Sequence, residues 1–161
     1  MKISRVAGTT SEILQVFIRD SSSTTGAGLT GLVFNSAGLT AYYCRNDQGT
    51  ATVISLVTMT AGTFTSSGFK EIDATNMPGW YQFCPPNAVF TSGRSAAIHL
   101  KGATNMAPLP IEVEITAWNN QDSVRGGMTA LPNAAAGANT GLPVVGTQVP
   151  NATAGAANGL Q

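Results

Sequence analysis

Clusters of turn-forming residues interrupt the chain about every ten residues, and this spacing limits what the chain can fold into. The clusters are rich in Gly, Pro, Asn and Ser, which tolerate or preset the backbone angles of turns. The intervals fit short β-strands but not the helical crossovers of a parallel sheet. The spacing therefore predicts an all-β sandwich or small barrel. The clusters are SSSTTGAG at 21–28, NSAG at 35–38, NDQG at 46–49, SSG at 66–68, NMPG at 76–79, PPN at 85–87 and NMAP at 105–108.

Alternating apolar residues identify individual strands between these turns. The alternation is clearest at 94–101 and 110–117, where its period of two is that of a half-buried strand. We predict about eight short strands, at 13–19, 31–34, 41–45, 52–60, 69–72, 80–83, 94–101 and 110–117. We predict that the same-face residues of three strands point into the core: Leu14, Val16, Ile18, Ala96, Ile98, Leu100, Ile111, Val113 and Ile115.

The charge composition excludes several classes of partner. Charged residues make up 10% of the chain, and 8 basic residues balance 8 acidic ones to a formal net charge of zero at pH 7. Such a chain has no electrostatic field to attract nucleic acid or an anionic membrane. The amino terminus lacks the apolar run of a secretory signal, and no apolar stretch approaches the ~20 residues of a membrane span. We predict a soluble protein that binds no nucleic acid and inserts into no membrane, with residues 1–10 as an N-terminal arm.

Cysteine and histidine are too few to build a metal site or a disulfide framework. The chain has two cysteines, Cys44 and Cys84, and a single histidine, His99. NDQG at 46–49 lacks the acidic spacing of a calcium loop, and GAGLTG at 26–31 lacks the lysine of a phosphate loop. We therefore predict no metal, no cofactor and two reduced thiols.

The residues with catalytic potential lack the partners that catalysis requires. His99 lies on the polar face of a predicted strand, where no nucleophile or orienting carboxylate accompanies it. Glu112 and Glu114 project from one strand face about 7 Å apart, which overlaps the carboxylate separation of inverting glycosidases, but this face is the predicted solvent face. We interpret Glu71 and Asp73 as solvent-facing carboxylates in the same way. The sequence predicts no catalytic residues and no enzymatic activity.

Large aromatic side chains leave a carbohydrate-binding alternative open. A sugar-binding module would present several aromatics on a flat exposed face, and Trp80 and Trp118 are the candidates. In a small sandwich a large aromatic more often lies in the core or a subunit interface, because its burial removes on the order of 150–250 Å² from water. We expect core or interface positions, with a glycan-binding face as the alternative.

The composition changes after Arg125, and this change marks the end of the patterned domain. Residues 126–161 contain no charged and no aromatic residue, and Ala and Gly make up 16 of these 36 positions. Such a segment has little apolar surface to offset the entropy of ordering it. We predict a β-sandwich domain at 1–118 and an extended linker or assembly arm at 119–161. The predicted contacts of the arm with a partner are its small apolar residues, notably Leu131, Leu142, Val144, Val145 and Val149.

Several longer segments resemble a domain that recurs in structural proteins of tailed bacteriophages. The resemblance is to the amino-terminal, particle-facing domain of baseplate and tail-fibre proteins, which in several families is immunoglobulin-like. It covers roughly residues 13–137. In that family an Ala-rich linker commonly leads into fibre or receptor-binding modules, whereas this sequence stops at Gln161. The segments are SSSTTGAGLTGLVFNSAGLTAYY at 21–43, GFKEIDATNMPGWYQFCPPNAVF at 68–90, HLKGATNMAPLPIEVEITAW at 99–118 and DSVRGGMTALPNAAAG at 122–137.

The resemblance implies an immunoglobulin-like antiparallel β-sandwich and a role in the virion. We expect a tail, baseplate or fibre-attachment adaptor that is made in the host cytoplasm and binds other virion proteins and copies of itself. The alternatives are a capsid-surface decoration protein and a module that binds a carbohydrate or receptor, with a host-surface glycan as its ligand. A hydrolase is the least favoured class, because no catalytic constellation is present.

Overall fold

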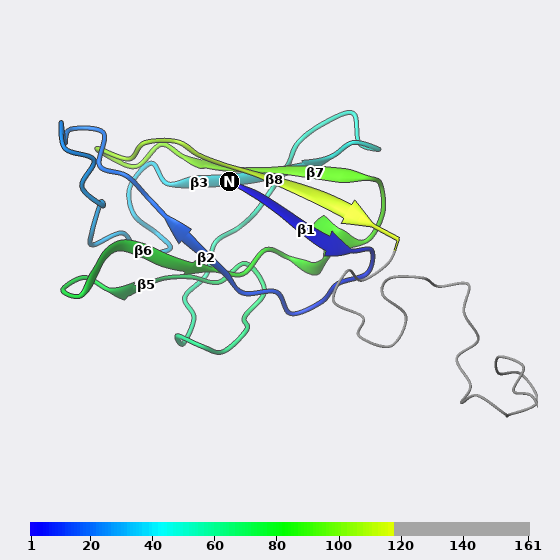
Figure 1. The fold of residues 1–161 in the computed structure, drawn as a ribbon, viewed down its shortest axis with the longest axis horizontal. Coiled ribbons are helices and arrows are strands. Elements are labelled where there is room, and N and C mark those ends of the chain that lie inside the picture. Colours follow the sequence, from blue (N-terminus) through cyan, green and yellow to red (C-terminus); the bar gives the residue numbers. More distant parts are fainter. Residues whose placement is uncertain (118–161) are drawn as a thin grey trace, which may run out of the picture. The chain divides into compact units, whose positions relative to one another are not determined.

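Eight β-strands run through residues 1–117, the part of the chain that the computed structural model describes (Figure 1). The strands are short because the turn clusters interrupt them, and one 3-10 turn, η1 (Asn87–Phe90), lies between β6 and β7. The strands are β1 (Lys2–Val6), β2 (Leu14–Phe17), β3 (Thr40–Arg45), β4 (Thr52–Val53), β5 (Phe69–Asp73), β6 (Met77–Phe83), β7 (Ser95–Lys101) and β8 (Leu109–Thr116).

The strands form two sheets that pack as a sandwich. One sheet has five strands in the order β1-β8-β7-β3-β4, and the other has three in the order β2-β6-β5. Every strand pair in these sheets is antiparallel except β1 and β8, which run parallel. The predicted all-β sandwich is confirmed, with this one parallel pair added to the antiparallel arrangement.

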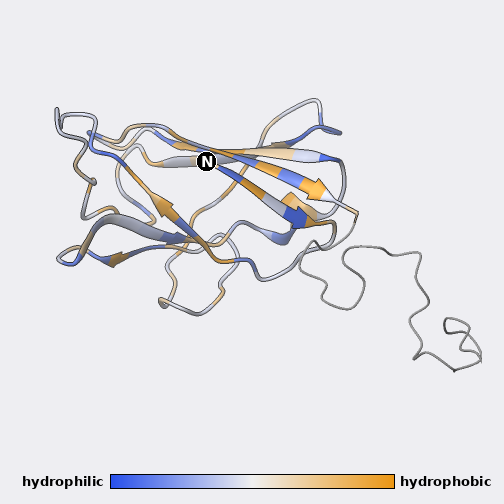
Figure 2. Ribbon diagram, viewed as in Figure 1, coloured by the Kyte–Doolittle hydropathy of each residue, from blue (hydrophilic) through white to orange (hydrophobic). Residues whose placement is uncertain are grey.

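Alternating burial along the strands builds one apolar core between the sheets. All nine residues predicted to face the core are at most 7% exposed. On β8 the apolar residues point inward and Glu112 and Glu114 point outward, an alternation that appears as orange and blue bands in Figure 2. The rings of Phe69 and Tyr81 stack inside the core, 4.9 Å apart and 7° from parallel. The predicted register of the best alternating strands is confirmed.

The first strand corrects the prediction of an N-terminal arm at residues 1–10. β1 pairs along its length with Glu112–Thr116 of β8, and the N–H of Glu112 donates to the carbonyl of Met1 at 2.8 Å. Of the β1 residues, Ile3 packs against the core cluster. The sequence did not predict this strand, because a single inward apolar residue gives no periodic pattern. Its partner strand is also distant in the sequence, so no local turn signal points to the pairing.

Two of the predicted strands, at 31–34 and 52–60, are shorter in the structure than in the prediction. Residues 31–34 make an isolated bridge between Val33 and Lys70, and the segment at 52–60 is reduced to β4 and a bridge between Val57 and Gly68. Gly31 adopts a φ of +81°, which takes the backbone out of the extended region at the start of the first segment. In the second segment the buried residues Ile54 and Met59 are five positions apart, which would put them on opposite faces of a continuous strand, so one buried face does not select a long strand.

The strand order is consistent with the expected immunoglobulin-like arrangement. Variable-type immunoglobulin domains place strands B-E-D in one sheet and C′-C-F-G in the other. Here β2-β6-β5 and β4-β3-β7-β8 occupy these places in the same chain order. The intersheet disulfide of antibody domains has no counterpart, because Cys44 and Cys84 are both free thiols.

Candidate functional site

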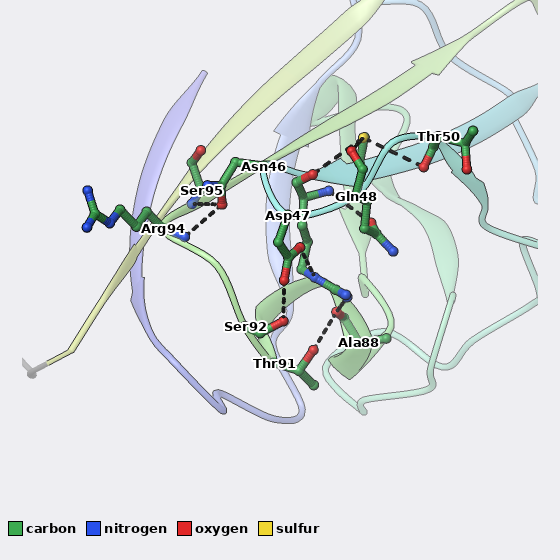
Figure 3. A network of polar contacts seen from close by, with 11 residues as sticks. Asn46, Asp47, Gln48, Thr50, Ala88, Thr91, Ser92, Arg94 and Ser95 are labelled. Carbon is green, nitrogen blue, oxygen red and sulfur yellow. Dashed lines mark hydrogen bonds and ion pairs between the residues drawn. The ribbon is translucent and has the colours of Figure 1, made fainter.

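A network of polar contacts joins the turn after β3 to the segment after η1 (Figure 3). Arg45 Nε donates to Asp47 Oδ1 at 3.0 Å, and Arg45 Nη1 donates to the carbonyl of Ala88 at 2.7 Å. The other oxygen of Asp47 accepts a hydrogen bond from Ser92 Oγ at 2.7 Å. The Ser92 hydroxyl, followed by the Arg45 guanidinium, lowers the pKa of Asp47. Asp47 therefore ties two loops together as a carboxylate.

Asn46 attaches the same turn to the start of β7. Its Oδ1 accepts the backbone N–H groups of Arg94 at 2.8 Å and Ser95 at 3.2 Å. A Cβ on Gly93 would come within 2.5 Å of this oxygen, and Gly93 has a φ of +84°. The positive φ favours glycine at this position, and a Cβ there would displace the Asn46 amide from its hydrogen bonds. The sequence marked 46–49 only as a turn, and the preference of Asn and Asp for bonding nearby backbone was the signal for these contacts.

The chemistry of this network is that of a structural clamp. Ser92 Oγ donates its proton to a carboxylate, whereas an activated serine donates to a general base that can remove the proton. The Arg45 guanidinium is occupied by Asp47 and by a backbone carbonyl. The network fastens the turn at 46–50 to the segment at 88–95.

Tyr81 and Glu71 hold the loop at 29–32 against the three-stranded sheet. The Tyr81 hydroxyl donates to the carbonyl of Leu29 at 2.7 Å and accepts the N–H of Leu32 at 3.2 Å. Glu71 Oε2 accepts the N–H of Gly31 at 2.9 Å, and Oε1 is buried without a hydrogen-bond partner in the part of the chain that the structure describes. Burial raises the pKa of Tyr81 to about 12.

The position of Glu71 shows that its interpretation as a solvent-facing carboxylate was wrong. Glu71 pairs in register with the buried Tyr81, so the two side chains share the inner face of the sheet. The register of β5 and β6 shifts between Glu71 and Asp73. Asp73 lies at the end of β5, where its carboxylate accepts the N–H groups of Thr75 and Asn76 in the β5–β6 turn at 2.8 and 2.9 Å. Glu71 also lines an open pocket of about 330 Å³ between the loop at 31–35 and β5.

The outer face of the five-stranded sheet carries the other predicted polar residues. His99 is exposed on β7 between Tyr42 of β3 and Pro110 of β8, and its side chain makes no hydrogen bond within residues 1–117. Glu112 and Glu114 lie opposite other β7 positions, and Glu114 forms an exposed ion pair of 3.7 Å with the lysine of β1. The structure therefore does not bring His99 and these carboxylates together as a catalytic group.

The outer face of the three-stranded sheet carries a pair of aromatic side chains. Phe17 of β2 and Trp80 of β6 are direct cross-strand neighbours, with ring centroids 5.6 Å apart and planes 53° apart. Phe17 is 37% exposed. Because the rings are tilted, the pair does not present the single flat platform expected of a sugar-binding face. The second candidate, Trp118, lies outside the described residues.

The remaining predictions concern the two cysteines, metal binding and the partner contacts of the arm. Cys44 and Cys84 are free thiols, as predicted, and burial raises the pKa of Cys84. Within residues 1–117 no cluster of His, Cys, Asp or Glu is suited to hold a metal ion, and no helix there is long and apolar enough to cross a membrane. The predicted partner contacts lie outside the described residues: Leu131, Leu142, Val144, Val145 and Val149.

Comparison with known proteins gave no match of any kind. No family model, no curated protein and no solved structure matches this chain.

Proposed function

We propose that the protein is a structural protein of a tailed-bacteriophage virion, a tail, baseplate or fibre-attachment adaptor that acts through protein–protein interfaces. It is made in the host cytoplasm and binds other virion proteins and copies of itself. The strand order carries this proposal, because it is the order expected of the immunoglobulin-like domain that the resemblance over 13–137 implies.

The described polar groups support a binding role more than a catalytic one. The Arg45–Asp47–Ser92 contacts and the Tyr81–Glu71 contacts fasten loops to the sandwich. The charged residues on the outer face of the five-stranded sheet are exposed, and Glu114 of β8 is paired with Lys2 of β1. A sandwich whose loops are tied down by side-chain hydrogen bonds and whose outer sheet faces are exposed suits repeated contact with neighbouring subunits.

Imaging of the intact particle by electron cryo-microscopy tests this role. We expect density for the sandwich in several symmetry-related copies on the tail, and density on the capsid surface would favour the decoration alternative instead.

A variant lacking residues 126–161 should keep a folded sandwich but enter particles less efficiently. The matched control replaces 126–161 by an uncharged Gly/Ser chain of equal length and should show the same defect. Absence of the full-length protein from purified particles would contradict the proposal.

A glycan-binding module is the second candidate, because Phe17 is exposed beside Trp80, although the tilted rings do not form one flat platform. Glycan-array binding that is lost in Phe17→Ala and Trp80→Ala, but kept in the control His99→Ala on the opposite sheet, would support it. A hydrolase would instead show turnover of a glycan or ester that His99→Ala or Glu114→Gln abolishes.

A further inference from the structure

The four edge strands of the sandwich differ in how they are protected from pairing with another chain. An unprotected edge presents free N–H and C=O groups and acts as a template for a further strand. β1 carries two charged residues, Lys2 and Arg5, and Arg5 Nη1 donates to the carbonyl of Ser4 at 2.7 Å. β4 has only two residues, and β5 is covered by isolated bridges from Val33 and Val57.

β2 has none of these protective features. Its sequence, LQVF, contains no charge and no proline, and its ladder with β6 has no register shift. The N–H of Ile18 donates to the carbonyl of Gly79 at 2.8 Å, so this N–H and, two residues earlier, the backbone groups of Val16 face β6, while the carbonyl of Ile18 accepts the N–H of Leu29 at 2.8 Å. By the same alternation the N–H and C=O groups of Gln15 and Phe17 face away from β6. Both residues are exposed.

This open edge has a defined length and place in the fold. The carbonyl of Arg19, next in the outward series, accepts the N–H of Ala107 at 3.0 Å, so the edge is closed beyond Phe17. Constant-type immunoglobulin sheets place strand A beside strand B at this position. Here the first strand pairs with β8 in the other sheet, and no strand of residues 1–117 occupies the place beside β2.

We propose that residues 144–149 of one copy add as a strand to the free edge of β2 in a second copy. This segment reads VVGTQV, rich in β-branched residues and free of charge. Pro143 and Pro150 flank it, and since proline has no N–H to donate, they limit the added strand to about the length of the open edge. The chain at 118–143 can extend to about 85 Å, enough to reach a neighbouring sandwich.

The proposal rests on the multi-copy assembly proposed above. A strand supplied by the same chain would close the edge of β2 without linking any copies. A strand supplied by a second copy makes a head-to-tail contact, which repeats from copy to copy and closes into a ring or continues as a filament. Backbone hydrogen bonds would supply the affinity, and the neutral surfaces of β2 and 144–149 meet without desolvating a charge.

The experiment blocks the edge and the added strand separately in the full chain. Gln15→Pro removes an outward N–H while leaving the ladder with β6 intact, and Ser4→Pro is its control, since it removes an equivalent outward N–H from β1. In the arm, the double variant Gly146→Pro, Thr147→Pro removes two adjacent N–H groups, one of which would point toward β2 in either register of the added strand. The double variant Ala156→Pro, Ala157→Pro, outside the segment, is its control. Sedimentation velocity over a concentration series measures association, and hydrogen exchange reports on the amides of Gln15 and Phe17.

We expect concentration-dependent association in the unmodified chain and in both controls. Gln15→Pro and the arm variant should weaken it about tenfold or more, and exchange at Gln15 and Phe17 should slow about tenfold or more only in the associated state. If Gln15→Pro unfolds, the arm variant decides, because it leaves residues 1–117 unchanged.

Three results would overturn the added strand. They are no association, association that survives both blocking variants, and protection of Gln15 and Phe17 in the monomer, which would place the arm on its own sandwich. Each of these leaves the virion role standing if the protein is found in particles. Absence from particles, in contrast, contradicts the virion role even if strand addition occurs.

Discussion

At the scale of single residues, the hydroxyl of Tyr81 satisfies two backbone groups of the loop at 29–32, one buried and one partly buried. Tyr81→Phe keeps the ring stacked on Phe69 but leaves the carbonyl of Leu29 and the N–H of Leu32 without their partner. We expect a loss of about 1–3 kcal/mol in the free energy of unfolding, measured by denaturant titration. Tyr42→Phe, on the outer face of the other sheet, is the control and should be close to neutral.

The same hydroxyl gives the stability a defined dependence on alkaline pH. Burial raises the pKa of folded Tyr81 from 10.0 to about 12, whereas the unfolded chain ionises near the lower value. The contribution to stability is therefore complete below pH ~10 and is lost as the pH rises toward 12, because the unfolded state alone releases its proton in this window. The stability difference between the unmodified chain and Tyr81→Phe should narrow across this range. A difference that stays constant would show that the hydroxyl is not buried.

At the scale of elements, the register of β8 decides which residues hold the sandwich together. Val113 is fully buried and Glu112 points to solvent. Val113→Asp places an unpaired charge in the core and should cost more than about 4 kcal/mol, which approaches the lower end of the usual stability of about 5–15 kcal/mol and should largely unfold the domain. Glu112→Ala should change stability by less than about 1 kcal/mol. Circular dichroism during thermal unfolding measures both, and a greater loss in Glu112→Ala would mean that the register is wrong.

The elements that the sequence predicts are those whose pairing leaves an alternating pattern. β7 and β8 lie inside the five-stranded sheet with one buried face, so their alternation is strict and their core residues could be predicted. β1 could not be predicted, because Ile3 is its one residue packed on the core and its partner strand is distant in sequence. Glu71 was misplaced because a carboxylate was assigned to the solvent face, although the alternation from buried Phe69 puts Glu71 on the inner face. Its partner there, the N–H of Gly31, is 40 residues away in the sequence and leaves no local pattern.

At the scale of the whole molecule, Met1–Ala117 is a compact unit with a hydrophobic core of its own. Its buried cluster runs from Leu14 to Ile115, and β1 at Lys2–Val6 completes the five-stranded sheet. A chain ending at Ala117 should therefore fold alone. At protein concentrations where the full chain is monomeric, we expect the two chains to differ by less than about 1 kcal/mol in the free energy of unfolding, since residues 118–161 offer little apolar surface to bury.

Calorimetry and urea titration of both chains at matched low concentration measure this difference. At higher concentration the full chain alone should gain stability, because strand addition binds the folded state and shifts the unfolding equilibrium by mass action. A truncated chain that is unfolded at low concentration would show that residues beyond Ala117 belong to the core of their own sandwich. Equal stability at every concentration would show instead that the arm contributes to neither folding nor self-association.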